Sequence, residues 1–378
     1  MNVCPKQAIT MVEDECGFVY PEIDSSKCVR CYACKQVCAL QNDKVGNEPR
    51  ETYVAANENT DQNAHSSSGG AFAALASWAL DRNGIIYGAA YTGDLSVECL
   101  RIVDGKELGK LQGSKYVQSR MGFAHKQIQD DLKTGRTVLF SGTPCQVAAV
   151  KSYLRRDYEN FFSVDIICHG VPSQKMLRDY LSMIGHVDEL QFRDKKKGWE
   201  DYFLRYKKGK RYHHIHCRLS SYYEYFLQGK IYRENCYSCK YASKQRYSDI
   251  TIGDYWGIRQ EHSELLKDKW WEERLYDGIS CVIVNTEKGK QILKDTKSLR
   301  LVESDYKKAS RGNGQLREPT QLTEERDRIL ALYKEGGWQA VDNDFRNRLS
   351  LDQKIKYYIK SHIPVKMKRT IKEALGIV

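Results

Sequence analysis

The central part of the chain alternates between short apolar runs and segments with helical periodicity. Strands and helices are expected in turn over Thr137–Phe140, Val147–Leu154, Phe161–Ile167 and Ser173–Ile184. Two successive strand–loop–helix units with short connections are typical of parallel strands joined by right-handed crossovers. The pattern therefore predicts an α/β fold, mixed α+β overall, in which ligands gather where the parallel strands end.

More regular structure is expected upstream of these units. The serines and glycines of 66–70 precede a helix predicted over Ala71–Asp81, which ends before Gly84. Serine at an N-cap and glycine just beyond a helix are common boundary signals. Ile85–Tyr91 and Cys99–Val103 follow as predicted strands.

Composition narrows the class of protein. Of the 378 residues, 41% are hydrophobic and 29% are charged, which is ordinary for a soluble globular chain. The best apolar segment, Ala71–Leu80, is shorter than the ~18 residues of a membrane-spanning helix. The N-terminal residues lack the basic region and apolar core of a secretory signal. We therefore expect a cytoplasmic protein.

Cysteine is the informative residue type. The chain has 13 cysteines, well below the ~8–10% of a disulfide-stapled protein, and they are clustered. Clustered cysteines in a protein without a secretory signal indicate metal ligands or redox groups.

Four of them have the spacing of a bacterial ferredoxin, Cys28-x2-Cys31-x2-Cys34-x3-Cys38. A tight loop lets the first three thiolates hold one [4Fe–4S] cluster, while the fourth ligates a different cluster. A zinc knuckle is the alternative, but zinc sites usually use two separated cysteine pairs. The spacing predicts an N-terminal iron–sulfur cluster.

The fourth ligand of that cluster is expected to be Cys4, because Cys4-Pro5 resembles the end of an earlier ferredoxin run. Cys38 is then a possible ligand of a missing second N-terminal cluster, and we expect the start of the sequence to omit upstream cysteines. The opposite assignment, with Cys38 in place of Cys4, also fits the sequence. Cys16 is interpreted as a small buried residue.

A second set of cysteines lies further along the chain. Cys145 and Cys168 follow the two predicted central strands, and Cys236-x2-Cys239 forms a close pair. The strand ends bring Cys145 and Cys168 onto neighbouring loops. Four thiolates are the number that a second [4Fe–4S] cluster requires. Spacing alone equally allows buried structural cysteines and an isolated pair.

Several short motifs occur in order along the chain. They are Ser67-Ser68-Gly69-Gly70, Gly113-Ser114-Lys115-Tyr116-Val117-Gln118-Ser119, Gly142-Thr143-Pro144-Cys145-Gln146, Cys168-His169-Gly170 and Gly253-Asp254-Tyr255-Trp256-Gly257. Over about residues 1–300, they resemble the beta-subunit family of the coenzyme F420 (deazaflavin) hydrogenases and dehydrogenases, preceded by a ferredoxin-type module. The resemblance implies an FAD-containing iron–sulfur oxidoreductase, with an inner [4Fe–4S] cluster at the second cysteine set.

The candidate FAD-binding residues follow from this resemblance and from loop chemistry. They are Ser67, Ser68, Gly69, Gly70, Gly113, Ser114, Lys115, Gln118, Ser119 and Thr143. A helix start rich in Ser and Gly offers free N–H groups, hydroxyls and a positive dipole end to a pyrophosphate, and Lys115 could supply a cation. An ordinary N-cap and a surface turn are the alternative. No G-x-G-x-x-G motif or Walker loop occurs, which disfavours a classical Rossmann site.

The sequence identifies no catalytic residue, although His169 is a candidate. Its ring could donate a hydrogen bond to a cluster sulfur or exchange protons with reduced flavin, and a packed loop histidine is the alternative. The segment from His213 to Cys217 is interpreted as a solvated strand in a basic region, and Asp254 as a turn residue or a flavin contact.

The excess of Lys and Arg over Asp and Glu, 60 against 49, gives a net charge of +11. No nucleic-acid recognition motif accompanies the basic runs, such as 195–197, so no nucleic-acid partner is expected. A positive face would attract an acidic electron-transfer protein such as ferredoxin, or an anionic substrate. The Lys-rich segment 351–378 could contact an anionic membrane surface, although a solvated terminal helix is the commoner explanation.

These observations predict four regions. They are a ferredoxin-type module with an incomplete first half (1–45), a flavin-binding region (52–132), an α/β region with the second cluster (133–305) and a basic helical tail (306–378). The expected function is FAD-dependent oxidation–reduction, in which electrons pass from a ferredoxin-like donor through [4Fe–4S] clusters to FAD and an unidentified small organic substrate. The alternatives are a zinc-binding nucleic-acid or scaffold protein, and a pure electron-carrier subunit.

Overall fold

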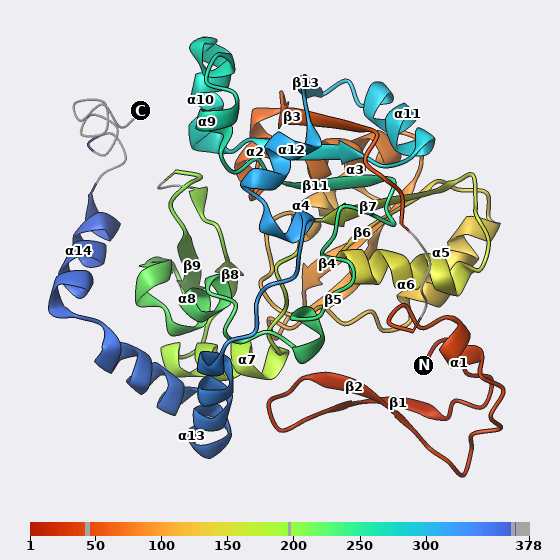
Figure 1. Cartoon of the computed structure of the whole chain (residues 1–378), viewed down its shortest axis with the longest axis horizontal. Coiled ribbons are helices and arrows are strands. Elements are labelled where there is room, and N and C mark those ends of the chain that lie inside the picture. Colours follow the sequence, from red (N-terminus) through yellow and green to blue (C-terminus); the bar gives the residue numbers. More distant parts are fainter. Residues whose placement is uncertain (42–45, 196–197, 364–366, 368–378) are drawn as a thin grey trace.

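The computed structural model describes residues 1–41, 46–195, 198–363 and 367. Its largest feature is a mixed sheet whose described strands have the order β13-β3-β12-β11-β7-β6-β4-β5 (Figure 1). In chain order these strands are β3 (Glu51–Asn57), β4 (Ile85–Tyr91), β5 (Val97–Ile102), β6 (Val138–Gly142), β7 (Phe161–Ile166), β11 (Ile250–Asp254), β12 (Ser280–Val284) and β13 (Leu299–Ser304). The expected α/β fold is confirmed.

The middle of the sheet is parallel. Strands β4, β6, β7 and β11 pair in parallel, with Val138 opposite both Ile85 and Phe161, whereas the remaining pairings are antiparallel. The predicted strands over 137–140 and 161–167 are confirmed as β6 and β7, and so is their parallel direction. Their carboxyl ends therefore lie at the same edge of the sheet.

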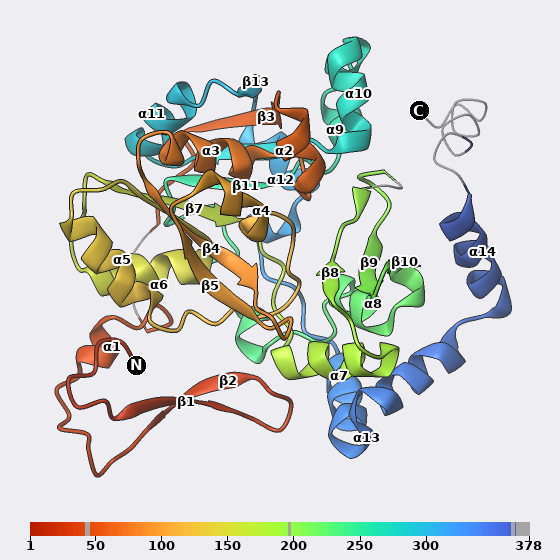
Figure 2. The ribbon, with the colours of Figure 1, turned by 180° about the vertical axis from the view of Figure 1, so that it is seen from behind.

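Helices cover both faces of the sheet (Figures 1 and 2). On one face lie α3 (Ala71–Leu80) and α11 (Glu287–Asp295), and on the other lie α5 (Ala124–Lys133) and α6 (Pro144–Leu154). The alternation within β4 matches this arrangement, since Ile86 packs with α3 and Ile85 with α5 and α6. Short helices complete the layers: α2 (Thr60–His65), α4 (Leu108–Leu111), α9 (Ile258–Glu261), α10 (Lys269–Asp277) and α12 (Tyr306–Arg311).

A second packed region lies beside the sheet (Figure 1). It contains α7 (Gln174–Ile184), the antiparallel strands β8 (Glu189–Gln191), β9 (Phe203–Lys208) and β10 (Arg211–His216), α8 (Ser221–Leu227) and α13 (Glu324–Arg348). Helix α7 is expected from the sequence, but it does not cover the sheet. Its apolar side, including Met176 and Tyr180, packs instead into an aromatic core with Tyr222 and Trp338.

The segment expected as a basic tail is mostly part of this second region. Helix α13 kinks at Gly336 and Gly337 and buries Ile329 and Phe345 in the aromatic core. Helix α14 (Leu351–His362) follows, and the basic residues of 364–366 and 368–378 lie outside the described part of the chain. Among the helices of the described residues, none has the length and apolarity needed to cross a membrane.

The N-terminal module is a hairpin of β1 (Ile9–Glu13) and β2 (Val19–Ile23), followed by the single-turn helix α1 (Ala33–Gln36). Cys16 and Phe18 are buried in the aromatic core of the second region, as expected for Cys16. The Ser173 hydroxyl donates a hydrogen bond of 2.6 Å to the Cys16 carbonyl. The module is therefore docked on the rest of the molecule.

Candidate functional site

The structure brings together the cysteines predicted to hold the N-terminal cluster. Cys4, Cys28, Cys31 and Cys34 line one small cavity of about 30 Å³. Arg30 and Tyr32 both have positive φ angles, 53° and 57°, which turn the chain tightly between the three cysteines of the loop.

The local hydrogen bonding suits a thiolate ligand. The Ala8 N–H donates to Cys4 Sγ at 3.3 Å, and this bond is the largest influence that lowers the pKa of the Cys4 thiol. A sulfur that is stabilised as a thiolate, beside three further cysteines, fits the donor set of an iron–sulfur cluster.

Cys38 lies elsewhere. Cys34 lies in the single-turn helix α1, and Cys38 follows the end of that helix. Cys38 lines the large cavity described below, whereas Cys34 lines the small one. The neighbouring Ala39 carbonyl accepts a hydrogen bond of 2.6 Å from the Tyr241 hydroxyl. Of the two assignments that the sequence allows, this geometry favours Cys4 over Cys38 as the fourth member of the N-terminal set.

The second cysteine set converges on a cavity of about 1570 Å³. Cys145 lies in the first turn of α6 and Cys168 follows β7, so the parallel strands position both, as expected. Cys236 and Cys239 come from a distant loop and line the same cavity. Thr143 Oγ1 lies 3.1 Å from Cys145 Sγ.

The pKa values of three of these thiols are raised, and the other cysteines of the set contribute to the change. Burial is the largest influence on the pKa of Cys236 and, with the charge of Cys145 and Cys239, raises it to about 12. Burial also raises the pKa of Cys145 and of Cys168. The raised pKa values of Cys145, Cys168 and Cys236 disfavour their thiolate forms in the free protein, and the positive charge of a cluster would favour those forms. The residues therefore fit a second cluster.

Nine of the ten predicted FAD-binding residues line this large cavity. They are Ser67, Ser68, Gly70, Gly113, Ser114, Lys115, Gln118, Ser119 and Thr143. Gly69 is the exception and does not line the cavity. It packs so closely against β3 that a Cβ at this position would lie 2.7 Å from the Ala55 carbonyl oxygen. The helix N-cap is Gly70, in the left-handed region with φ 80°, and no serine side chain caps α3. The serine hydroxyls make other contacts instead, such as the bond of 3.0 Å that Ser68 Oγ donates to the Ile279 carbonyl.

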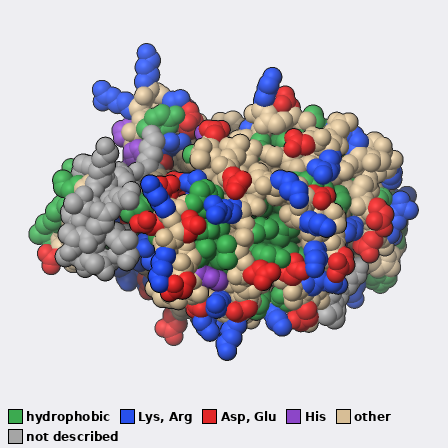
Figure 3. All heavy atoms as spheres, turned by 90° about the horizontal axis from the view of Figure 1, so that it is seen from above, with side chains coloured by type: hydrophobic (Ala, Val, Ile, Leu, Met, Phe, Trp, Pro, Cys, Tyr) green, Lys and Arg blue, Asp and Glu red, His purple; other side chains and the backbone are tan. Residues whose placement is uncertain are grey.

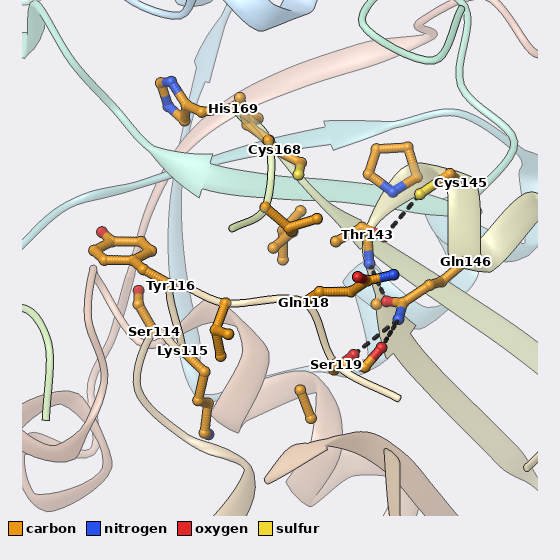
Figure 4. Close-up of a pocket in the computed structure, with 18 of the residues that line it drawn as sticks. Ser114, Lys115, Tyr116, Gln118, Ser119, Thr143, Cys145, Gln146, Cys168 and His169 are labelled. Carbon is orange, nitrogen blue, oxygen red and sulfur yellow. Dashed lines mark hydrogen bonds between the residues drawn. The ribbon is translucent and has the colours of Figure 1, made fainter. Parts of the chain in front are cut away.

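Hydrogen bonds join the predicted loops to one another. The Ser114 N–H and hydroxyl both donate to Ser67 Oγ, at 2.6 and 2.8 Å. Gln146 accepts from the Thr143 N–H at 3.0 Å and donates to Ser119 Oγ at 2.8 Å (Figure 4). One continuous wall therefore carries all three loop motifs.

Lys115 has an unusual environment for a lysine. Its ammonium group donates to the carbonyls of Gln112 and Lys110 at 2.7 and 3.1 Å, and burial lowers its pKa to about 7. In Figure 4 the side chain points away from Cys168 and His169. A pKa near 7 means that Lys115 carries only part of its charge at neutral pH.

Sequence reasoning missed the polar network behind the Ser67–Gly70 loop. Lys195 donates to the Ser68 carbonyl at 2.6 Å, and the buried Arg193 pairs with Asp254 at 3.1 Å. Trp199 Nε1 also donates to Asp254, at 2.7 Å. Lys195 belongs to an expected basic run, whose other members, 196 and 197, lie outside the described residues. In the sequence, only the Gly-Asp-Tyr-Trp-Gly motif around Asp254 indicates this network.

A family model decides the assignment of the central part of the chain. The model for the C terminus of the beta subunit of coenzyme F420 hydrogenase/dehydrogenase matches residues 135–308. These residues belong to that family. The family domain, defined here as residues 135–308, contains all four inner cysteines, together with Arg193, Lys195 and Asp254.

One solved structure resembles the chain over much of its length. It is described as a xenon derivatization of the F420-reducing NiFe hydrogenase complex from Methanosarcina barkeri, and the matching chain shares 16% sequence identity with this one. The alignment covers 78% of this chain and 96% of that chain, with a TM-score of 0.48. No curated protein matches the chain.

The family domain also carries His169. Figure 4 shows its ring directed away from Cys168, whose sulfur points toward Cys145. The residue lines the large cavity and is exposed. A hydrogen bond to cluster sulfur, proton exchange with reduced flavin and a packed loop histidine therefore stay predictions.

One sequence interpretation changes in part in this region. The strand expected from His213 is formed and His213 is exposed, but His216 is buried and stacks on Tyr357 with ring centroids 4.8 Å apart. His214 Nδ1 lies 2.8 Å from Asp194. Within the described residues, no three His, Cys, Asp or Glu side chains, those of the two cysteine sets included, are grouped so as to hold a single metal ion. A [4Fe–4S] cluster differs from a single ion, because each of its four thiolates binds a different iron atom.

Proposed function

We propose that the chain is an iron–sulfur flavoprotein oxidoreductase that takes electrons from a ferredoxin-like protein and delivers them, through two [4Fe–4S] clusters and FAD, to a small organic substrate. The match of residues 135–308 to the family model supports an electron-transfer role of the oxidoreductase type. The finer proposal depends on one observation above the others. Four cysteines from three separate segments line the same cavity as the candidate FAD loops.

The cavity supports a site for more than one ligand. Its volume of about 1570 Å³ exceeds the ~300–1,000 Å³ of ordinary small-molecule sites, so a cofactor and a second molecule have room side by side. FAD, when bound, supplies the exchange between one-electron and hydride-type two-electron chemistry. The N-terminus of α3 offers N–H groups to a pyrophosphate, and the Ser67 hydroxyl, which accepts from Ser114, has its own hydrogen left to donate.

The surroundings of the N-terminal cysteines support an acidic protein donor. Cys31 is exposed, and the exposed side chains of Lys6, Arg30 and Lys35 lie in the same short module. The exposed Tyr32 adds an aromatic contact. Arg30 and Lys35 lie within four residues of Cys31 in the sequence, and exposed cations near an accessible cluster would orient an acidic electron-transfer partner.

The function is tested by anaerobic purification of the full chain, with iron, sulfide, zinc and flavin quantified. We expect about eight iron and eight sulfide per chain, from two four-iron clusters, and one FAD. Cys31→Ser and Cys145→Ser should each lose about half of the iron, whereas Cys99→Ser, a cysteine outside both cavities, should lose none. Stoichiometric zinc without iron or flavin would favour the zinc-binding alternative.

A second measurement separates an enzyme from a pure electron carrier. The isolated, fully loaded chain is reduced with dithionite-treated ferredoxin and then offered candidate substrates. Reoxidation of the flavin that depends on an added organic substrate supports the oxidoreductase. Reoxidation that occurs only with an added partner protein contradicts it.

A further inference from the structure

Helix α14 exposes an apolar stripe. Leu351, Ile355, Tyr358 and Ile359 recur at helical spacing, so they share one face, and they are 71%, 49%, 62% and 51% exposed. A helix that is merely solvated places polar residues outward. Here four large apolar side chains are exposed together on one face, beside exposed polar residues such as Asp352 and Gln353.

The opposite side of α14 fixes this orientation. Tyr357 stacks on the buried His216, and Lys360 pairs with Asp201. Figure 2 shows α14 at the edge of the molecule, beyond β9 and β10. Because Tyr357 and Lys360 also line the large cavity, the stripe lies on the outer side of an element that forms the rim of that cavity.

Positive charge accompanies the stripe. Lys354 and Lys356 are both exposed, and at ~100° per residue they fall on either side of the apolar face, while Asp352 is the one acidic residue of α14. Lysine stems can extend along an apolar surface and keep their charged ends in a polar layer. By sequence, residues 364–378 add four cations, Lys366, Lys368, Arg369 and Lys372, against Glu373.

We propose that α14 docks on an anionic lipid surface. An apolar face flanked by lysines has the chemistry of a helix lying in a bilayer interface, where the apolar side chains enter the acyl boundary and the cations meet anionic headgroups. The sequence leaves membrane contact and a solvated helix as alternatives, and the outward stripe favours the membrane.

A second copy of the chain fits the stripe less well. Lysines on both sides of each stripe would face one another across a dimer, where like charges repel. The helix is only about 18 Å long, at ~1.5 Å per residue. Four side chains on one such helix offer less than the ~800 Å² per partner of a stable interface.

The test uses the full, loaded chain and sedimentation with vesicles. One vesicle contains phosphatidylglycerol and phosphatidylcholine in a 3:7 ratio (roughly physiological anionic content), and the other contains phosphatidylcholine alone. The triple variant Leu351→Gln, Ile355→Gln, Ile359→Gln should bind the anionic vesicles at least tenfold more weakly than the wild type. Leu322→Gln, at an exposed leucine outside α14, is the matched control and should bind like the wild type.

The charge contribution is tested separately. Lys354→Gln with Lys356→Gln should weaken binding to the anionic vesicles by roughly fivefold per lysine and leave binding to pure phosphatidylcholine unchanged. Equal sedimentation of wild type and triple variant overturns the proposal. So does a wild-type dimer, seen by light scattering, that the triple variant loses. Iron and flavin content should be the same in all variants, which keeps this test independent of the proposed oxidoreductase function.

Discussion

At the scale of single residues, Lys115 links anion binding to pH. Burial lowers its pKa to about 7, so the free protein carries only part of this charge at neutral pH. A phosphate bound nearby would favour the ammonium form and raise that pKa. Binding then takes up a proton, so its contribution is complete below pH 7 and is lost as pH rises toward the pKa of the bound state.

We therefore predict that FAD affinity falls by up to tenfold per pH unit from about pH 7 to 9. Lys115→Met should bind FAD more weakly and lose most of this slope, whereas Lys106→Met, at a neighbouring exposed lysine, should keep it. Quenching of flavin fluorescence, titrated at each pH, measures the affinity. An unchanged slope in Lys115→Met would show that Lys115 does not face the phosphate.

Lys195 donates hydrogen bonds to the backbone around the Ser67–Gly70 loop. Its ammonium group donates to the carbonyls of Ser68 and Asn63 at 2.6 and 2.8 Å. Lys195→Met removes the donor and leaves partly buried carbonyls without it, which should lower the free energy of unfolding by about 1–3 kcal/mol. Urea titration measures this change. Because the loop loses its tether, FAD affinity should fall in parallel, and a stability loss with unchanged affinity would contradict the role in positioning.

At the scale of elements, the short helix α1 decides which cysteines act together. It places Cys34 at the small cavity and Cys38 at the large one. Cys4→Ser should therefore remove the N-terminal cluster, whereas Cys38→Ser should keep it. Iron content and the low-temperature electron paramagnetic resonance spectrum of the reduced protein distinguish the two. The reverse result would make Cys38 the ligand.

The elements also show what a sequence can predict. The strands β4, β6 and β7 were predictable because short apolar runs with clear boundaries leave few alternatives, and their parallel direction places Cys145 and Cys168 at one edge. Periodicity also identified α7, but an amphipathic helix does not reveal which core covers its apolar face. That core is built from α8 and α13, distant in sequence.

The residues of the candidate site also fall into a group that the sequence could predict and a group that it could not. Loops that follow predicted strands or precede predicted helices could be assigned, because local chemistry identifies them. The approach of Cys236 and Cys239 to Cys145, and the contact of Lys195 with Ser68, depend on tertiary packing that no local pattern encodes. For the inner cysteines, the resemblance to a family supplied what spacing alone left open.

At the scale of the whole molecule, the net charge is +11, and on the face in Figure 3 charges of both signs are interspersed. A continuous basic surface of the kind that nucleic acid requires is not seen on that face. Local groups of charge therefore matter more than the total, and the N-terminal module carries one of them around its exposed Cys31.

The last prediction concerns that group. Arg30→Glu with Lys35→Glu should slow the second-order reduction of the chain by a reduced acidic ferredoxin by at least tenfold at low ionic strength. The difference should shrink as salt shortens the Debye length from about 10 Å at 0.1 M toward 3 Å at 1 M. Lys294→Glu with Lys297→Glu makes the same change of net charge at α11 and the residues just after it, away from the module, and should leave the rate near that of the wild type. Stopped-flow absorbance measures all three proteins. If both double variants slow the reaction equally, the donor responds to total charge, and a specific docking site at the N-terminal module is contradicted.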